Sequence, residues 1–266
     1  MRNNKIRHSS DERRVAVLID CENVSAKNIE FIMKESLKYG LLTIKRIYGD
    51  WTDTMLSSWK AFLPIFAIQP IQQFKNTAGK NSTDSSMIID AMDILYSDNV
   101  ECFIIVSSDS DFTRLAIRLR ESGKFVVGIG EEKTPKSLVN SCNEFNYIEI
   151  IKERSNEIKR KVGGIQHKKK ISAKNGSEIK KDEKDDYAED KCLSILCEAY
   201  NMVDPDSEWK NSSKIGNAIR KLDPGFDPQT FGFSKLSLLF KKYDDVFNVK
   251  LGEDNRTHYV KLKDPE

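Results

Sequence analysis

The feature that most constrains the fold is an alternation, from Arg14 onward, of short apolar runs with longer amphipathic stretches. Short runs rich in β-branched residues are typical of strands, and the amphipathic stretches between them predict helices. Repeated strand-helix units build an α/β fold with a parallel sheet flanked by helices. We predict strands at residues 15–19, 43–48, 67–74, 102–106, 125–129 and 147–150, and helices at 25–39, 54–61, 84–96, 111–122 and 135–142.

The charge pattern changes twice after this α/β region. Between Ile151 and Lys181 there are eleven Lys or Arg against three Asp or Glu, and residues 182–190 then hold six acids and one lysine. A tract with so few apolar residues cannot bury enough surface to fold. We therefore predict a charged flexible linker at residues 152–186. Its lysines either attract nucleic acid or are simply solvated.

Structure is expected to resume after this linker. Three amphipathic stretches, at 188–200, 214–222 and 234–242, predict helices, and 246–251 and 258–263 predict two short strands. Such a set predicts a small winged-helix-like domain. The predicted organisation is a disordered tail at residues 1–12, an α/β domain at 13–151, the linker, and a C-terminal domain at 187–264.

Composition excludes several kinds of site. The five cysteines show no C-x-x-C spacing, and the three histidines are far apart in the sequence. This pattern argues against a zinc site and against a His-dependent nucleophile, and it favours reduced core thiols. No apolar run approaches the roughly 20 residues that cross a bilayer, and the N-terminus lacks the apolar segment of a signal peptide. We predict a cytoplasmic protein.

Acidic residues stand where two of the apolar runs end. Asp20 ends the first run, and Asp109 and Asp111 follow the run at 102–106. Parallel strands place their carboxyl ends at one edge of the sheet, so these acids are expected to share a crevice with Asp84 at the start of a helix. Converging carboxylates repel one another unless a cation neutralises them, and oxygen ligands suit Mg²⁺ or Mn²⁺. Each acid taken singly has helix capping or strand termination as an alternative role.

Polar residues near these acids are candidates for supporting roles. Asn23, three residues after Asp20, is expected to orient a water or a ligand carboxylate, and helix capping is its alternative. Lys80 is predicted to contact a phosphate, although its stretch is not a P-loop because Asn81 replaces the Ser or Thr of that motif. The predicted substrate contacts are Lys80, Ser107, Ser110 and Thr113.

Three blocks of the sequence resemble the NYN domain of the LabA-like branch in the PIN-like nuclease superfamily. The blocks are Leu18-Ile19-Asp20-Cys21-Glu22-Asn23, Lys80 with Thr83-Asp84, and Ser107-Ser108-Asp109-Ser110-Asp111-Phe112. The resemblance implies a Rossmann-like sheet and a Mg²⁺- or Mn²⁺-dependent ribonuclease site. It implies that the acidic ligands are Asp20, Asp84, Asp109 and Asp111, and that Asn23 accompanies them. Ser108 departs from the family pattern, which usually has glycine there.

The C-terminal region resembles an OST-HTH (LOTUS) domain. The resemblance rests on Trp209 and on residues 213–222, 223–228 and 231–236. It implies a module that binds RNA or acts as a protein adaptor.

These observations predict a metal-dependent endoribonuclease whose substrate is single-stranded or structured RNA. One alternative is a non-catalytic RNA-binding or adaptor protein in which the PIN-like domain is a scaffold. Another is a phosphatase or nucleotide hydrolase that uses the same metal site. The sequence leaves the number of metals and the oligomeric state open.

Overall fold

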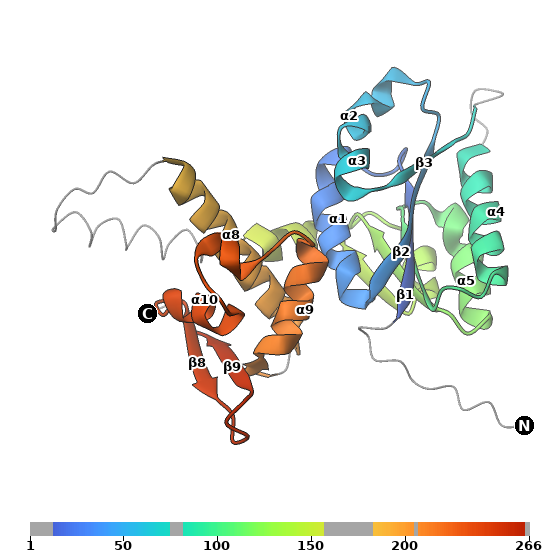
Figure 1. Cartoon of the computed structure of the whole chain (residues 1–266). Coiled ribbons are helices and arrows are strands. Elements are labelled where there is room, and N and C mark those ends of the chain that lie inside the picture. Colours follow the sequence, from blue (N-terminus) through green and yellow to red (C-terminus); the bar gives the residue numbers. More distant parts are fainter. Residues whose placement is uncertain (1–12, 75–81, 157–182, 205–206, 264–266) are drawn as a thin grey trace, which may run out of the picture. The chain divides into compact units, whose positions relative to one another are not determined.

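A computed structural model describes residues 13–74, 82–156, 183–204 and 207–263. The chain divides into two compact units, Met1–Glu153 and Arg154–Glu266 (Figure 1). The first unit has two buried apolar cores, one on each face of its sheet, and the second unit has one. None of the helices within the described ranges is long and apolar enough to cross a membrane.

The first unit is built on a six-stranded sheet that is parallel throughout. Its strand order is β3-β2-β1-β4-β5-β6, and β1 pairs with both β2 and β4. The order reverses between β1 and β4, where an open parallel sheet forms a crevice beyond its carboxyl edge. The predicted α/β fold and the expected adjacency of the first and fourth strands are confirmed. The strands are β1 (Arg14–Asp20), β2 (Leu41–Gly49), β3 (Gln69–Gln72), β4 (Cys102–Val106), β5 (Phe125–Gly130) and β6 (Glu144–Tyr147).

Helices cover both faces of this sheet. The helices α1, α2 and α3 lie on one side of β1 and β2, and α4 and α5 lie on the other (Figure 1). Alternate residues of β1 enter different cores: Val17 packs into the first, and Ala16 and Leu18 pack into the second. A strand buried on both faces gives a continuous apolar run in the sequence. The helices are α1 (Ile29–Ser36), α2 (Ser57–Lys60), α3 (Phe62–Phe66), α4 (Ser82–Tyr96), α5 (Thr113–Glu121) and α6 (Lys136–Ser141), with short 3₁₀ turns η1 (Ala26–Asn28), η2 (Leu37–Tyr39), η3 (Thr54–Leu56) and η4 (Ser110–Phe112).

Several predicted boundaries were wrong. The sixth strand was expected at 147–150, but β6 ends at Tyr147 and residues 148–156 are helical. Ile148 and Ile151 both enter the first core from that helix, so their apolar character reflects helical rather than strand burial. Helix α4 begins at Ser82, two residues earlier than expected, so Asp84 lies in its first turn and is not its cap.

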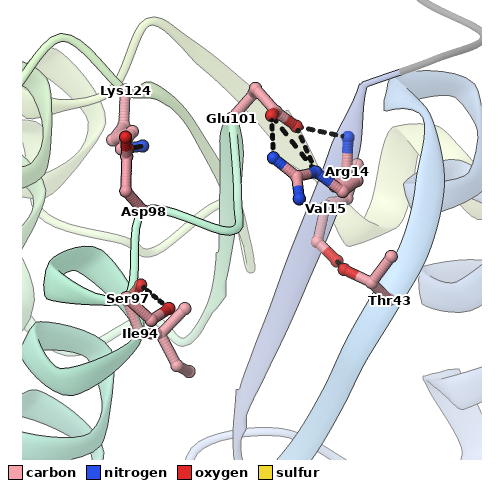
Figure 2. A network of polar contacts seen from close by, with 8 residues as sticks. All are labelled: Arg14, Val15, Thr43, Ile94, Ser97, Asp98, Glu101 and Lys124. Carbon is pink, nitrogen blue, oxygen red and sulfur yellow. Dashed lines mark hydrogen bonds and ion pairs between the residues drawn. The ribbon is translucent and has the colours of Figure 1, made fainter.

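Ion pairs lie at the amino edge of the sheet, where β1, β4 and β5 begin. The Arg14 guanidinium donates to the Glu101 carboxylate, with 2.6 Å between Nη2 and Oε1, and the Arg14 backbone N–H donates to Oε2 at 2.7 Å (Figure 2). Nearby, Lys124 Nζ lies 2.5 Å from Asp98 Oδ1. Burial acts to raise the pKa of Glu101, but hydrogen bonds from Arg14 and its charge outweigh burial and lower that pKa.

The second unit joins three helices to a three-stranded antiparallel sheet of order β7-β9-β8. The winged-helix-like arrangement of helices and a terminal hairpin is confirmed. Strand β7 was not predicted, because two residues are too few to show alternation. The elements are α8 (Glu183–Met202), β7 (Lys210–Asn211), α9 (Ser212–Leu222), η5 (Pro228–Phe231), α10 (Leu236–Lys242), β8 (Phe247–Leu251) and β9 (His258–Leu262).

The buried Lys210 of β7 has a structural partner. Its ammonium donates to the Tyr200 carbonyl oxygen in the last turn of α8 at 3.0 Å and lies 4.3 Å from the centre of the Tyr200 ring. Helix carbonyls of the last turn lack partners within the helix, so a buried cation there satisfies one of them. This lysine therefore holds β7 against the end of α8.

Some sequence predictions concern residues that the structure describes only in part. The predicted tail at residues 1–12 lies outside the described residues. So does most of the predicted linker, but residues 152–156 are helical and α8 begins at Glu183. All five cysteines are buried free thiols.

Candidate metal centre

Three carboxylates converge at the carboxyl edge of the parallel sheet. Asp84 comes from the first turn of α4, Asp109 follows β4, and Asp111 lies in η4. Each offers an oxygen atom, and these atoms all lie within 4.8 Å of one another. The structure thus brings together three of the four acids that the sequence selected as ligands.

The fourth acid, Asp20, is held deeper in the protein. Its side chain is 1% exposed at the end of β1. Asp20 Oδ2 accepts hydrogen bonds from Asn23 Nδ2 at 2.7 Å and from Ser107 Oγ at 2.8 Å, and Oδ1 accepts one from the Glu22 backbone N–H at 3.1 Å. Burial raises the pKa of Asp20, and these hydrogen bonds act in the opposite direction. Asp20 is therefore a positioned, buried carboxyl group outside the set of three.

The electrostatics of the set are those of crowded like charges. Burial and the negative charges of Asp20, Asp109 and Asp111 raise the pKa of Asp84 to about 6, and Glu22 adds to the effect. The charged groups that act most on Asp84 are therefore all acids. A divalent cation would relieve this repulsion, and carboxylate oxygens are the ligands that Mg²⁺ and Mn²⁺ prefer. The donor set therefore fits a hard divalent cation.

The turn after β4 fixes the orientation of Asp109. Its Oδ1 accepts a hydrogen bond from the Asp111 backbone N–H at 2.9 Å, which caps η4. Its own backbone N–H donates to Ser107 Oγ at 3.0 Å. Ser107 is fully buried and also donates to Asp20, so one hydroxyl links the acidic ends of β1 and β4. Asp109 thus combines a capping role with membership of the acidic set, whereas Asp84 does not cap its helix.

Ser108, the residue that departs from the family pattern, has a defined contact. Its Oγ accepts a hydrogen bond from the Glu131 backbone N–H at 2.9 Å, just after β5. The backbones approach closely here, since a Cβ added to Gly130 would lie 2.7 Å from the Ser107 carbonyl oxygen. Ser108 therefore ties the loop that carries Asp109 to the neighbouring strand.

Two further residues extend the acidic region, and neither was selected as a site residue from the sequence. Thr83 is buried, and its Oγ1 donates to Glu22 Oε1 at 3.1 Å. This contact brings the exposed Glu22 beside the first turn of α4 and next to Asp84. The sequence alone does not show that Glu22 lies beside Thr83, because the two residues are 61 positions apart.

The other predicted site residues occupy different environments. Ser110 is exposed in η4, and Thr113 Oγ1 is buried without a hydrogen-bond partner. Lys80 lies outside the described residues. On α4, Asp93 is exposed, whereas the Asp90 carboxylate binds the Arg46 guanidinium and the Tyr48 hydroxyl and so anchors α4 to β2.

Family models match both parts of this chain. The model of the NYN domain matches residues 14–149, and that of the OST-HTH/LOTUS domain matches residues 187–259. The uncharacterized protein MJ0482 of Methanocaldococcus jannaschii is 27% identical over 132 residues, which are 48% of this chain and 52% of that protein. The chain thus spans about half the length of this curated relative. A solved structure, the protein of unknown function VPA0982 from Vibrio parahaemolyticus, is 18% identical with a TM-score of 0.45, over 53% of this chain and 96% of that one.

Proposed function

Because the chain belongs to the NYN domain family over about half of its length and carries an OST-HTH/LOTUS domain, we propose that it is a metal-dependent endoribonuclease. Its reaction is the hydrolysis of RNA phosphodiester bonds. The observation that carries this proposal is the convergence of Asp84, Asp109 and Asp111, whose oxygen atoms lie within 4.8 Å of one another. A scaffold has no physical need for crowded like charges, because each such contact lowers stability.

In this proposal Asp84, Asp109 and Asp111 hold Mg²⁺ or Mn²⁺, and Asp20 supplies further negative charge at the end of β1. Such a cation would activate water and stabilise the charge that develops on a phosphate during displacement. Asn23 and Ser107 keep the Asp20 carboxylate oriented through their hydrogen bonds. Because Ser107 is fully buried, we assign it this positioning role in place of the predicted substrate contact.

The remaining parts of the chain are proposed to bind RNA. Lys80 and Ser110 remain the proposed substrate contacts. The Thr113 hydroxyl is buried, so it is no longer proposed as one. Lysines of the proposed linker at 152–186 would neutralise flanking phosphates, which an acidic site by itself repels. The C-terminal domain, proposed at 187–264, would bind RNA or a protein partner. We propose that the protein acts in the cytoplasm.

The test is RNA cleavage by the purified full chain. Single-stranded and structured RNAs are incubated with Mn²⁺ or Mg²⁺, with and without a chelator, and the products are sized. Asp109→Asn is the informative variant, because asparagine also caps helices and so preserves the turn while removing the charge. Asp93→Asn is the matched control, because Asp93 is exposed on α4 outside the acidic set.

We expect cleavage that requires the metal, is lost in Asp109→Asn and persists in Asp93→Asn. RNA binding without metal-dependent cleavage would instead indicate the non-catalytic adaptor. Faster turnover of small phosphate esters than of RNA would indicate a phosphatase.

A further inference from the structure

A concave feature opens at the carboxyl edge of the sheet in the first unit, the edge that also carries the acidic set. It is a cleft of about 330 Å³. Its walls come from Cys21 and Glu22 after β1, from Asp50 after β2, and from Asp53, Ser58 and Trp59 of the segment that forms η3 and α2. Ligands of open α/β sheets bind outside the carboxyl ends of the strands, so this cleft is at a position where a ligand is expected.

Glu22 connects the cleft to the acidic set. It lines the cleft, and its carboxylate accepts the hydrogen bond from Thr83, the residue before Asp84. An RNA whose phosphate lies at the acidic set would therefore have its neighbouring nucleotide beside the cleft.

The chemistry of the walls favours a base over a phosphate. Met55 supplies exposed apolar surface in front of the buried Val24, Leu56 and Trp59. Asp50 and Asp53 supply carboxylates. None of the described residues that line the cleft is a Lys, Arg or His. A phosphate would be repelled there, whereas a flat base would cover the apolar surface and offer its edge to the carboxylates.

Carboxylates only accept hydrogen bonds, so they discriminate between bases. Guanine, adenine and cytosine each carry an exocyclic amino group that can donate to a carboxylate, as cytosine N4 does to Asp or Glu in nucleic-acid complexes. Uracil has a carbonyl oxygen in place of the cytosine amino group. Its one donor on that edge, N3–H, lies between two carbonyl oxygens that a carboxylate would repel.

Local contacts hold the cleft in shape. Asp50 Oδ1 accepts hydrogen bonds from Thr52 Oγ1 at 2.6 Å and from Gln72 Nε2 at 2.9 Å, which fixes the turn after β2. Asp53 Oδ1 accepts one from the Met55 backbone N–H at 2.9 Å and so caps η3. At Gly49 an added Cβ would lie 2.2 Å from Cys21 Sγ. A glycine is therefore required for the end of β2 to approach the segment after β1 this closely.

We propose that this cleft is a subsite for the nucleobase next to the scissile phosphate, and that it selects bases with an exocyclic amino group over uracil. This inference rests on the proposed ribonuclease function for its place in the reaction. Binding in the cleft can nevertheless be measured without any cleavage.

The binding test compares cytidine with uridine, which are matched in size and differ at the amino group. Each nucleoside is titrated into the full chain and followed by saturation-transfer NMR. We expect cytidine to bind about tenfold more tightly than uridine, the discrimination of a good base contact. Asp53→Asn should bring this ratio close to one, because asparagine keeps the cap but removes the charge.

Steric variants locate the binding. Ser58→Tyr would fill the cleft from an exposed position, whereas Ser57→Tyr places the same side chain on the neighbouring exposed residue outside it. We expect cytidine binding to be lost in the first variant and kept in the second. Equal binding of cytidine and uridine, or equal loss in both tyrosine variants, would overturn the subsite.

A cleavage test separates this inference from the proposed function. Cleavage sites mapped in a random RNA pool should be depleted of uridine at one flanking position, and Asp53→Asn should remove the depletion while cleavage continues. Cleavage without base preference would overturn the subsite and leave the nuclease intact. Tighter binding of cytidine without any RNA cleavage would support a nucleoside site and overturn the nuclease.

Discussion

Acidic residues have opposite surroundings at the two edges of the parallel sheet. At the amino edge Glu101 faces Arg14, and Asp98 faces Lys124 (Figure 2). At the carboxyl edge, Asp84 faces other acids. The pKa of Glu101 is lowered, whereas that of Asp84 is raised to about 6. The same sheet therefore carries neutralised acids at one edge and crowded acids at the other.

Under the proposed function, the acids of the amino edge are structural and the crowded acids of the carboxyl edge are functional. A paired acid at a sheet edge helps to hold strands together, and its partner lies within hydrogen-bonding distance. Crowded acids lower the stability of the metal-free protein, because each additional negative charge favours protonation of the others. Residues that lower the free energy of unfolding are expected at binding sites, where the bound ligand restores stability. For these acids the proposed ligand is a cation.

The largest expected difference is between the effects that substituting an acid at each edge has on metal binding and RNA cleavage. Asp84→Asn removes one ligand of the proposed centre, so Mn²⁺ affinity and RNA cleavage should each fall at least about 100-fold. Glu101→Gln changes the same kind of group at the amino edge and should leave both unchanged. Calorimetry with Mn²⁺ and a cleavage assay measure the two effects. Similar losses in both variants would show that Asp84 acts through the fold.

A second prediction concerns pH. The raised pKa of Asp84, about 6, means that protons compete with the cation for this carboxylate below that pH. If one proton is displaced, Mn²⁺ affinity should fall about tenfold for each pH unit below 6 and stay nearly constant above 7. Titrations between pH 5 and 8 check this. An affinity that is flat down to pH 5 would contradict a role for Asp84 as ligand.

A third prediction concerns the buried acid of the carboxyl edge. Asp20→Ala leaves the buried Ser107 hydroxyl without its acceptor, and leaving such a group unpaired costs about 1–3 kcal/mol of unfolding free energy. Urea unfolding measures the change. Asp93→Ala, at an exposed position, should change stability by less than about 0.5 kcal/mol. A stable Asp20→Ala protein would mean that the hydrogen bonds around Asp20 contribute little.

The smallest expected effects are opposite shifts of melting temperature in the metal-free protein. Because the folded-state pKa of Asp84 lies above its ordinary value of 3.8, ionised Asp84 destabilises the fold above pH 6. Asp84→Asn should therefore raise the melting temperature at pH 7.5, and the gain should disappear as pH falls to about 4.

Glu101 should show the reverse. Its folded-state pKa lies below the ordinary value of 4.5, so its stabilisation is present above that pH and is lost as pH falls through the folded-state value. Glu101→Gln should slightly lower the melting temperature at pH 7.5 and have little effect in acid. Thermal unfolding at both pH values tests the pair. If the melting temperatures of both variants shifted in the same direction, the acids at the two edges would not differ in their effect on stability.

Local patterns in the sequence were sufficient to predict the α/β architecture of the first unit. The alternation of apolar runs with amphipathic stretches depends on the period of each element, so it predicted the strands and helices of the sheet. It misplaced β6 and the start of α4, because a short apolar segment such as Ile148–Ile151 fits a strand or a helix equally well.

The sequence by itself determined the α/β fold and selected the acids at the ends of two strands, because both follow from residue order and spacing. Only the tertiary structure decided what each acid contacts. In the folded protein Asp20 accepts a hydrogen bond from Ser107, which is 87 residues away in the sequence. Glu22 accepts one from Thr83, which is 61 residues away. The tertiary structure also forms the cleft from the ends of two strands and a helical segment. Side-chain partners across such separations depend on how elements pack, which residue spacing does not specify.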